Sequence, residues 1–441
     1  MPEWKEMLPK GWLHWVSAII LVGIVAVYAA CWAHGNWAGL TDPLVQNGDV
    51  RQHVMPMHRY DGKGTLANDP VALNMLAMST LGLRLIYMVL SPTVGLYVGP
   101  KIVQLICFSI FFAALFIVAR SRRGGLACAA LMCFFVFHTE EIICSFGGGF
   151  QRNFGIPLLM LWTAGAVTER RRVRYTAIIL LALTYPVVLL VALAGEGVFM
   201  LRNGIDFRSV RLRKAFIFYA VVVMSCFVII QVDRFTKPRR GGPPTLEEAQ
   251  ADPAFGRKGR TRQVPIYNPA KLTIRTFTNV FGARPHDTYK TQCAWSYIDP
   301  AGDFRKMGAT GALVVTAFLI FLCFARLTPV PGTVVALFCG TMFLYTLARA
   351  FAFKLYIPDR YIFYGISISA VTLGASAIGL AGAGVRPYSR RSALRNIYAA
   401  LAIVVGIILT GDHLVRDVWV RIDRRDRAEV WDYLETLPRT S

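Results

Sequence analysis

The sequence has few charged residues for its length. Only 17% of its 441 residues are Asp, Glu, Lys or Arg, whereas 55% are hydrophobic, and the mean hydropathy is +0.47. A soluble globular domain has about 25% charged residues, because its surface must be hydrated. The scarcity of charge therefore excludes an ordinary soluble domain and favours a chain that is buried in a lipid bilayer.

Several organising features are also missing. The nine cysteines are odd in number and include no Cys-x-x-Cys pair, which argues against a disulfide framework and a zinc site. No internal repeat is visible, which weakens an inverted-repeat transporter. The chain is basic, with 48 Lys and Arg against 26 Asp and Glu, but it has no basic and aromatic module for nucleic acid. We therefore expect no nucleic-acid partner.

Long hydrophobic runs are what the sequence has instead. Because a lipid core offers no hydrogen-bond partners, a backbone that crosses it must satisfy its own polar groups as a helix. The sequence predicts an all-α polytopic membrane protein with about 10–11 transmembrane segments, including a proline-broken re-entrant pair, and the longest runs can cross about 30 Å of hydrocarbon. The first run is long for a cleavable signal peptide, so we expect an uncleaved helix, with cleavage as the alternative. The clearest runs are 12–32, 96–119, 125–145, 154–169, 215–232, 308–325 and 361–384.

Basic segments predict the orientation of the chain. Short loops that are rich in Arg and Lys stay on the cytoplasmic side of a membrane. The four such segments are 120–123, 170–174, 202–214 and 386–395. The N-terminus is then cytoplasmic, in the inner (cytoplasmic) membrane, and residues 1–411 form the membrane domain. The outer face receives 33–72, 146–153, 233–306, 353–360 and an extracytoplasmic tail, 412–441.

Two segments depart from simple crossings. Residues 175–201 must leave and return, but they are too short for two full crossings, and Tyr185-Pro186 lies near their middle. Proline disrupts a helix, so we expect two half-helices that meet at Pro186 as a re-entrant hairpin. Residues 71–91 carry Arg84 among apolar residues, which predicts an interfacial helix within a first outer loop over 33–94.

The first outer loop is rich in ionisable residues. If residues 49–59 are helical, then Asp49, Gln52 and His53 share one face of the helix, and Arg59 follows about two turns later. A carboxylate beside His and Gln can accept a proton or hold a divalent cation such as Mg or Mn, with Asp49 and His53 as the candidate ligands. The alternative interpretation is a group of solvated residues that tether the loop.

Two further outer segments carry charged residues. Glu140 and Glu141 lie near the outer end of an apolar run, where a carboxylate usually faces a cavity or a partner. Arg152 precedes the next helix. The guanidinium groups of Arg152 and Arg360 are suited to binding a phosphate, and Lys354 adds a positive charge. Alternatively, Arg152 neutralises Glu140 or Glu141, and Lys354 and Arg360 contact lipid headgroups.

The second outer segment also contains three consecutive glycines, Gly147 to Gly149. Glycine has no side chain beyond its α-hydrogens, so another group can approach its backbone closely. We expect these glycines to let a ligand approach the backbone.

The order of these motifs resembles the GT-C superfamily of multi-pass glycosyltransferases and a set of bacterial membrane proteins related to it. The motifs are GDVRQH at 48–53, NDP at 68–70, GGGFQRNFGIPLL at 147–159, the proline-broken helix, YIPDRY at 356–361 and VWDYLETLP at 430–438.

The resemblance implies a reaction and a location. It implies transfer of a sugar from a polyprenyl-phosphate carrier on the extracytoplasmic face, within the cell envelope, with Asp49 as the base or metal ligand. No second acidic residue stands beside Asp49, whose neighbours are Gly48 and Val50. The alternative is therefore a non-catalytic accessory or scaffold subunit of a larger membrane complex, and a third hypothesis is a transporter.

Overall fold

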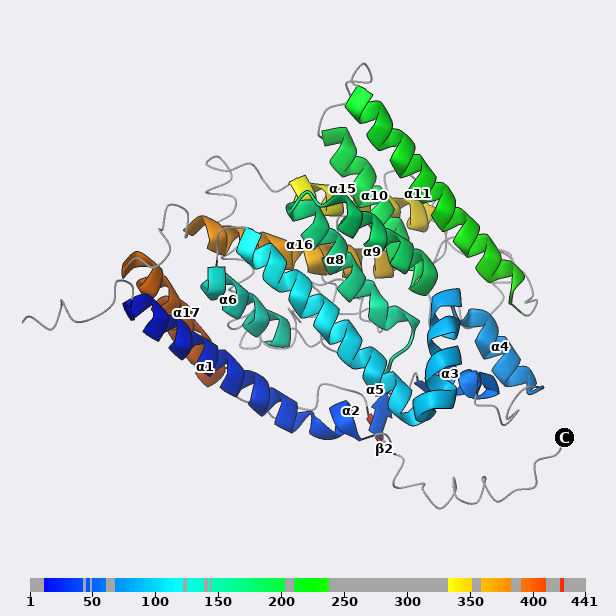
Figure 1. Ribbon diagram of the computed structural model, residues 1–441, viewed down its shortest axis with the longest axis horizontal. Helices are drawn as coiled ribbons and strands as arrows, with labels where there is room; N and C mark the ends of the chain where they lie inside the picture. Colours follow the sequence, from blue (N-terminus) through cyan, green and yellow to red (C-terminus); the bar gives the residue numbers. More distant parts are fainter. Residues whose placement is uncertain are drawn as a thin grey trace, which may run out of the picture.

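The computed structural model describes a largely helical chain (Figure 1). Within the described residues the predicted helical class is confirmed, and the only strands there are β1 (Val45–Asn47) and β2 (Arg421–Asp423). These strands pair antiparallel, with Val45 opposite Asp423, so the predicted first outer loop lies beside the predicted tail. The described residues are 12–42, 45–47, 50–60, 68–121, 125–138, 142, 145–202, 210–237, 332–350, 358–381, 390–409 and 421–423.

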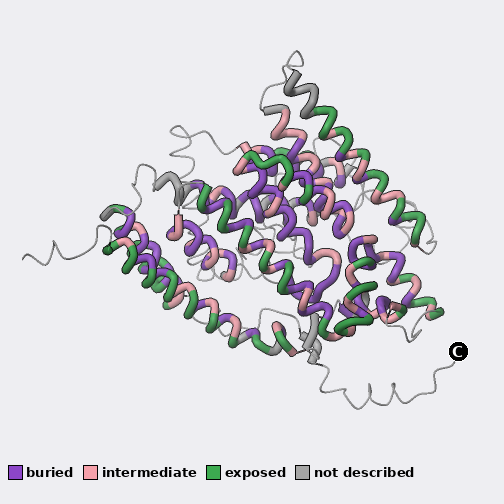
Figure 2. The backbone as a smooth tube through the Cα atoms, viewed as in Figure 1, coloured by how far each residue is buried: buried purple, intermediate pink, exposed green. Residues whose placement is uncertain are grey.

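Four helices of the described chain are long and apolar enough to cross a membrane. They are α1 (Trp12–Gly35), α5 (Leu81–Ser121), α11 (Val210–Phe235) and α17 (Arg390–Leu409). Large hydrophobic side chains are exposed on them, including Ile19 on α1 and Ile217 on α11, and Figure 2 shows the exposed stripes in green. Exposed apolar surface of this kind, on helices of this length, suggests a membrane-embedded protein.

The other described helices are shorter or pack inside this frame. Those of 13 to 24 residues are α6 (Gly125–His138), α8 (Gly155–Val167), α9 (Arg171–Thr184), α10 (Pro186–Arg202), α15 (Gly332–Ala350) and α16 (Pro358–Ala381). The short ones are α2 (Trp37–Thr41), α3 (Val50–His53), η1 (Met55–Tyr60), α4 (Pro70–Met78) and η2 (Gln151–Phe154).

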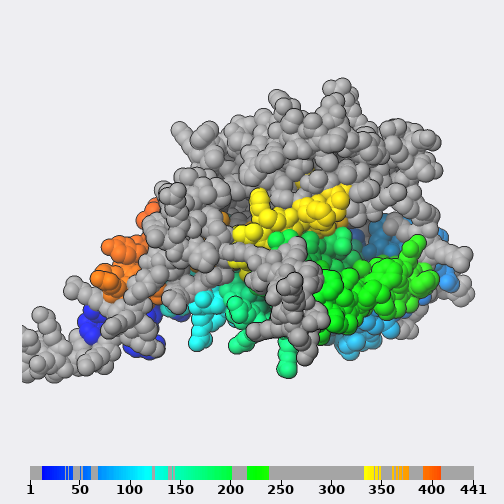
Figure 3. All heavy atoms as spheres, turned by 90° about the horizontal axis from the view of Figure 1, so that it is seen from above, coloured from blue at the N-terminus to red at the C-terminus, as the bar shows by residue number. Residues whose placement is uncertain are grey.

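The main core lies where α10 packs between α8 and α15. A Cβ on Gly195 of α10 would lie 3.2 Å from the ring of Trp162, and a Cβ on Gly340 of α15 would lie 2.8 Å from the Gly195 nitrogen. Figure 3 shows α15 in yellow beside the green helices. The glycines allow this close approach, because any side chain would separate the two helices.

The predicted interfacial helix over 71–91 is in fact two helices. α4 begins after Asp69, whose carboxylate caps it by accepting a hydrogen bond from the Ala72 nitrogen (2.6 Å), and it ends at Met78. The remainder belongs to α5, which the backbone of Gly95 interrupts with φ 78° and ψ 168°. Glycine adopts a positive φ readily, so the chain turns there before the run that was predicted to begin at residue 96.

The predicted break at Pro186 is present. α9 ends at Thr184, Tyr185 leaves the helix with φ −148° and ψ 83°, and α10 begins at Pro186. Proline fits the first position of a helix, where its missing N–H costs nothing. Arg174 and Glu196 lie equally far from Tyr185 along the chain and form an ion pair of 3.4 Å, so α9 and α10 fold back on each other as a hairpin.

Segments that were predicted to share the outer face contact one another. The Tyr87 hydroxyl donates to the Gly149 carbonyl (2.8 Å), which joins the predicted first outer loop to the triglycine segment. Lys101 Nζ, in the predicted span 96–119, donates to the Gly39 carbonyl (2.5 Å), and Thr80 Oγ1 donates to the Thr184 carbonyl (2.8 Å) in the predicted hairpin. Together with the β1–β2 pair, these bonds gather the first outer loop, the triglycine segment, the hairpin tip and the start of β2 at one end of the bundle. We refer to this end as the β end.

Segments that were predicted to be cytoplasmic also gather together. The Ser392 hydroxyl lies 2.9 Å from His14 Nδ1, and Asn396 Nδ2 donates to Ser17 Oγ at 3.2 Å. α1 and α17 therefore begin side by side, as the blue and brown helices of Figure 1 show. These contacts place one of the four basic segments, 386–395, beside the start of α1.

An ion-pair network joins α5 to the end of α11. Arg84 Nη2 donates to Asp233 Oδ1 at 2.8 Å and to Thr236 Oγ1 at 2.7 Å, and Nη1 donates to the Thr236 carbonyl at 3.1 Å. Lys237 Nζ lies 2.6 Å from the other oxygen of Asp233. The side chain of Arg84 is only 8% exposed, and these bonds satisfy both of its terminal nitrogens, while Nε has no partner within the described residues.

We predict that Arg84→Gln destabilises the protein. The substitution removes charge-assisted hydrogen bonds and should lower the free energy of unfolding by about 2 kcal/mol, with Lys237 still compensating Asp233. Denaturation of the purified protein in detergent measures this. Arg120→Gln is the matched control, because Arg120 lies on the same helix and is exposed. Equal loss of stability in both variants would contradict the importance of the network.

Candidate functional site

Two of the predicted outer segments meet at Phe150, which is fully buried. The ring of His53, at the end of α3, stacks on the Phe150 ring with centroids 5.2 Å apart and planes 15° apart. The guanidinium carbon of Arg152 lies 4.6 Å from the centroid of the same ring. His53 and Arg152, about a hundred positions apart in the sequence, therefore share one aromatic contact.

Asn153 closes the loop that carries Arg152. Its Nδ2 donates to the carbonyls of Ser145 (2.5 Å) and Gly147 (2.8 Å), and its Oδ1 accepts from the Phe150 nitrogen (2.7 Å). The side chain is fully buried, and only an amide can donate two hydrogen bonds and accept one in this arrangement. The loop around Phe150 is thus built rigidly from its own sequence.

The triglycine segment contacts protein at Gly149, where we expected a ligand. Gly149 has φ 65°, and a Cβ there would lie 2.5 Å from the Pro100 Cα of α5. The Tyr87 hydroxyl donates to the carbonyl of the same residue. Close approach of a helix, rather than of a ligand, therefore accounts for this glycine.

Arg360 enters the same region from α16. Tyr364, one turn after Arg360, packs against Gly155 and Tyr185, with the two tyrosine rings 5.6 Å apart and 73° inclined. Gly155 begins α8, three residues after Arg152. The starts of α8 and α16 and the tip of the α9–α10 hairpin therefore meet at the β end, with Arg360 in the first turn of α16 and Arg152 in η2, directly before α8.

The other predicted site residues are placed less fully. Arg59 is exposed in η1, where its guanidinium carbon lies 5.9 Å from the Tyr60 ring centroid. Gln52 lies in α3, but its side chain is outside the described residues. Asp49, Glu140, Glu141 and Lys354 lie outside the described residues.

The described cluster is suited to binding an anion. Arg152 and His53 lie on the Phe150 ring, and Arg360 stands at the start of the neighbouring helix α16. Two guanidinium groups match the oxygens of a phosphate. Among the described residues no three His, Cys, Asp or Glu lie together as metal ligands. His53 alone does not make a cation site, so a cation there depends on Asp49.

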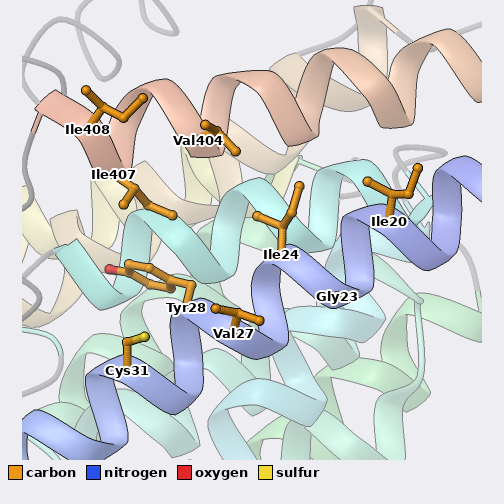
Figure 4. Close-up of a pocket in the computed structure, with 9 residues that line it drawn as sticks. All are labelled: Ile20, Gly23, Ile24, Val27, Tyr28, Cys31, Val404, Ile407 and Ile408. Atoms are coloured by element: carbon orange, nitrogen blue, oxygen red, sulfur yellow. The ribbon is translucent and has the colours of Figure 1, made fainter.

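Apolar grooves lie elsewhere on the molecule. One of about 510 Å³ runs between α1 and α17 and is lined by Ile20, Gly23, Ile24, Val27, Tyr28, Cys31, Val404, Ile407 and Ile408 (Figure 4). A second, of about 670 Å³, follows the face of α11 from Phe216 to Ile229. Neither groove is lined by a charged residue, so neither offers a cationic group for phosphate binding.

No protein-family model, curated protein or solved structure matches this chain. The chemistry open to the cluster around Phe150 is therefore inferred from its own residues.

Sequence reasoning missed the residues that hold the cluster in place. In the sequence, Asn153 stands out only as part of the motif GGGFQRNFGIPLL, and neither Tyr87 nor Lys101 is among the predicted site residues. A lysine inside an apolar run needs a polar partner, so the sequence position of Lys101 predicts such a contact. The partner is the Gly39 carbonyl. The long-range partner of Tyr87 has no local signal, since its contact with Gly149 depends on the kink of α5.

We predict that Gly149→Ala and Gly23→Ala change stability in opposite directions. A Cβ at Gly149 clashes with the α5 backbone at a positive φ, which should cost about 2 kcal/mol or more. A Cβ at Gly23 meets nothing within 4 Å, and Ala is favoured over Gly in a helix by up to about 1 kcal/mol. Thermal unfolding in detergent compares them. A tolerated Gly149→Ala would show that the loop does not pack on α5 in this way.

Proposed function

We propose that the chain is a GT-C-like integral protein of the bacterial cytoplasmic membrane, and that it transfers a sugar from a polyprenyl-phosphate carrier. The observation that carries this proposal is the packing of Tyr364 against Gly155, which sets the start of α8, three residues after Arg152, beside the helix whose third residue is Arg360. Two guanidinium groups on helices that begin at the same end can bind a phosphate that sits where apolar helices leave the membrane.

In this proposal the β end is extracytoplasmic. The basic segments at the other end, which include the exposed Arg170, Arg171 and Arg172, then face the cytoplasm. A polyprenyl tail would remain among the apolar helices, while its phosphate and sugar would reach the arginines. The donor and the membrane lipid are thus the expected partners.

The reaction would be a displacement at the anomeric carbon of the donor. An acceptor hydroxyl oxygen forms a bond to that carbon while the bond from the carbon to the carrier phosphate breaks. Asp49 accepts the proton of the hydroxyl. Negative charge grows on the departing phosphate, where Arg152 and Arg360 stabilise it. No step is assigned to a cation, because the described residues offer only His53 as a ligand.

An accessory subunit is the second candidate function. The observation that favours it is that His53 and Arg152 both pack on the buried ring of Phe150, a contact that a purely structural cluster would also form. In this case the exposed apolar face of α11 would contact other membrane subunits. The two candidates differ in whether the arginines meet a phosphorylated donor.

We predict that Asp49→Asn lowers turnover by about 10²–10⁴-fold, the usual contribution of general-base assistance, without changing the stability of the fold. Arg360→Lys should weaken donor binding, because lysine keeps the charge but loses the planar fork. The assay is consumption of synthetic polyprenyl-phosphate sugars by protein in nanodiscs made with native lipid extract.

Arg172→Lys is the control for this experiment, since Arg172 is exposed at the opposite end of the bundle. It should consume donor as the unmodified protein does. Consumption that is absent, or that is equal in all variants, would favour the accessory subunit.

A further inference from the structure

A buried ion pair lies in the bundle far from the cluster around Phe150. The side chains of Arg174 and Glu196 are 7% and 0% exposed, and their charged atoms are 3.4 Å apart. Trp162 Nε1 donates to Glu196 Oε2 at 3.1 Å. The Arg174 guanidinium carbon lies 4.9 Å from the Phe199 ring centroid and 5.8 Å from that of Tyr175.

This ion pair is poorly satisfied by hydrogen bonds. Within the described residues, Arg174 Nε and Nη1 have no hydrogen-bond partner, whereas Glu196 also interacts with the side chain of Tyr175. A buried pair with unmet hydrogen bonds stabilises a fold little more than apolar residues of similar volume would. Stability alone therefore does not explain two charges at this place, whereas fixing the register of neighbouring helices does.

The pair closes the open end of the α9–α10 hairpin, and the closed tip of the hairpin lies at the candidate site. At the tip, the Thr184 carbonyl accepts from Thr80, and the Tyr185 ring packs on Tyr364 and Gly155. These contacts come from α5, α16 and α8. Arg360 lies at the start of α16, and Arg152 lies three residues before the start of α8.

The second arm of the hairpin is tightly held along its length. Gly195, next to Glu196, lies between the Trp162 ring, 3.2 Å from where its Cβ would stand, and Gly340 of α15, whose Cβ would lie 2.8 Å from the Gly195 nitrogen. A close-packed helix moves as a unit, because its neighbours have no space to absorb a shift. A change of register at Glu196 is therefore carried along α10 to Pro186.

We infer that Arg174 and Glu196 are a positioning pair for the site at the β end. They act through the hairpin on the packing of the Tyr185 ring against Tyr364 and Gly155. The assignment of the contacts around Tyr185 to a donor site rests on the proposed function. The coupling of the Arg174–Glu196 pair to the tip of the hairpin does not. The pair sets the register of α9 against α10, and this register sets where the tip meets α8 and α16.

Hydrogen exchange of the full-length protein in nanodiscs tests this inference. The reporters are the amides of Val188 and Leu189, which donate to the Tyr185 carbonyl at 3.1 and 3.3 Å. Glu196→Gln keeps an acceptor for Trp162 but leaves Arg174 without its counter-charge. Exchange at the two reporters should rise about tenfold or more, while exchange in α17 stays unchanged.

The double variant Arg174→Met/Glu196→Gln separates positioning from stability. It removes both charges, so the melting temperature should return toward that of the unmodified protein, while exchange at Val188 and Leu189 stays raised. Three results would overturn the inference: a rise confined to the residues around 174 and 196, an equal rise in all helices, or recovery of the reporters together with the melting temperature. Since no donor is used, a failure of the proposed function leaves this test intact.

Discussion

The interruption of the helix at Tyr185 and Pro186 is the constraint on which the rest of the structure depends. It folds α9 and α10 back into a hairpin and leaves backbone carbonyls at the tip without helical partners. In an apolar bundle these groups must be satisfied by protein. Thr80 satisfies the Thr184 carbonyl, which draws the start of α5 to the tip, and the Tyr185 ring seats the starts of α8 and α16. The meeting point of four elements thus follows from one proline.

The packing of α5, α8 and α16 on the tip of the hairpin makes the candidate site rigid. Arg152 stands on a loop that Asn153 closes and Gly149 presses against α5, and Arg360 stands one turn from the tyrosine that contacts the tip. Buried packing and hydrogen bonds therefore hold the segments that carry the two arginines. Such support is what a phosphate site needs, because misplacement by about 1 Å is enough to weaken catalysis strongly.

Much of the frame was predictable from the sequence, because its signals are local. Pro186 marks the break, and Asp69-Pro70 marks the start of α4. The division of 71–91 and the role of Gly149 were not predictable, since both depend on where α5 bends and what then packs against it. The convergence of Arg152 and His53 depends on the burial of Phe150, which no spacing in the sequence encodes. The role of Asp49 remains a prediction, as this residue lies outside the described part of the chain.

The central claim is that the β end, with its cluster around Phe150, faces the extracytoplasmic side. Single cysteines at Arg59 and Arg172, which are exposed at opposite ends, and one within 241–262 test it directly in a background without reactive native cysteines. A membrane-impermeant maleimide added to intact cells should label the cysteines at 59 and in 241–262, and label the cysteine at 172 only after the membrane is opened. Labelling of position 172 in intact cells, with 59 and 241–262 protected, would reverse the orientation and contradict the account.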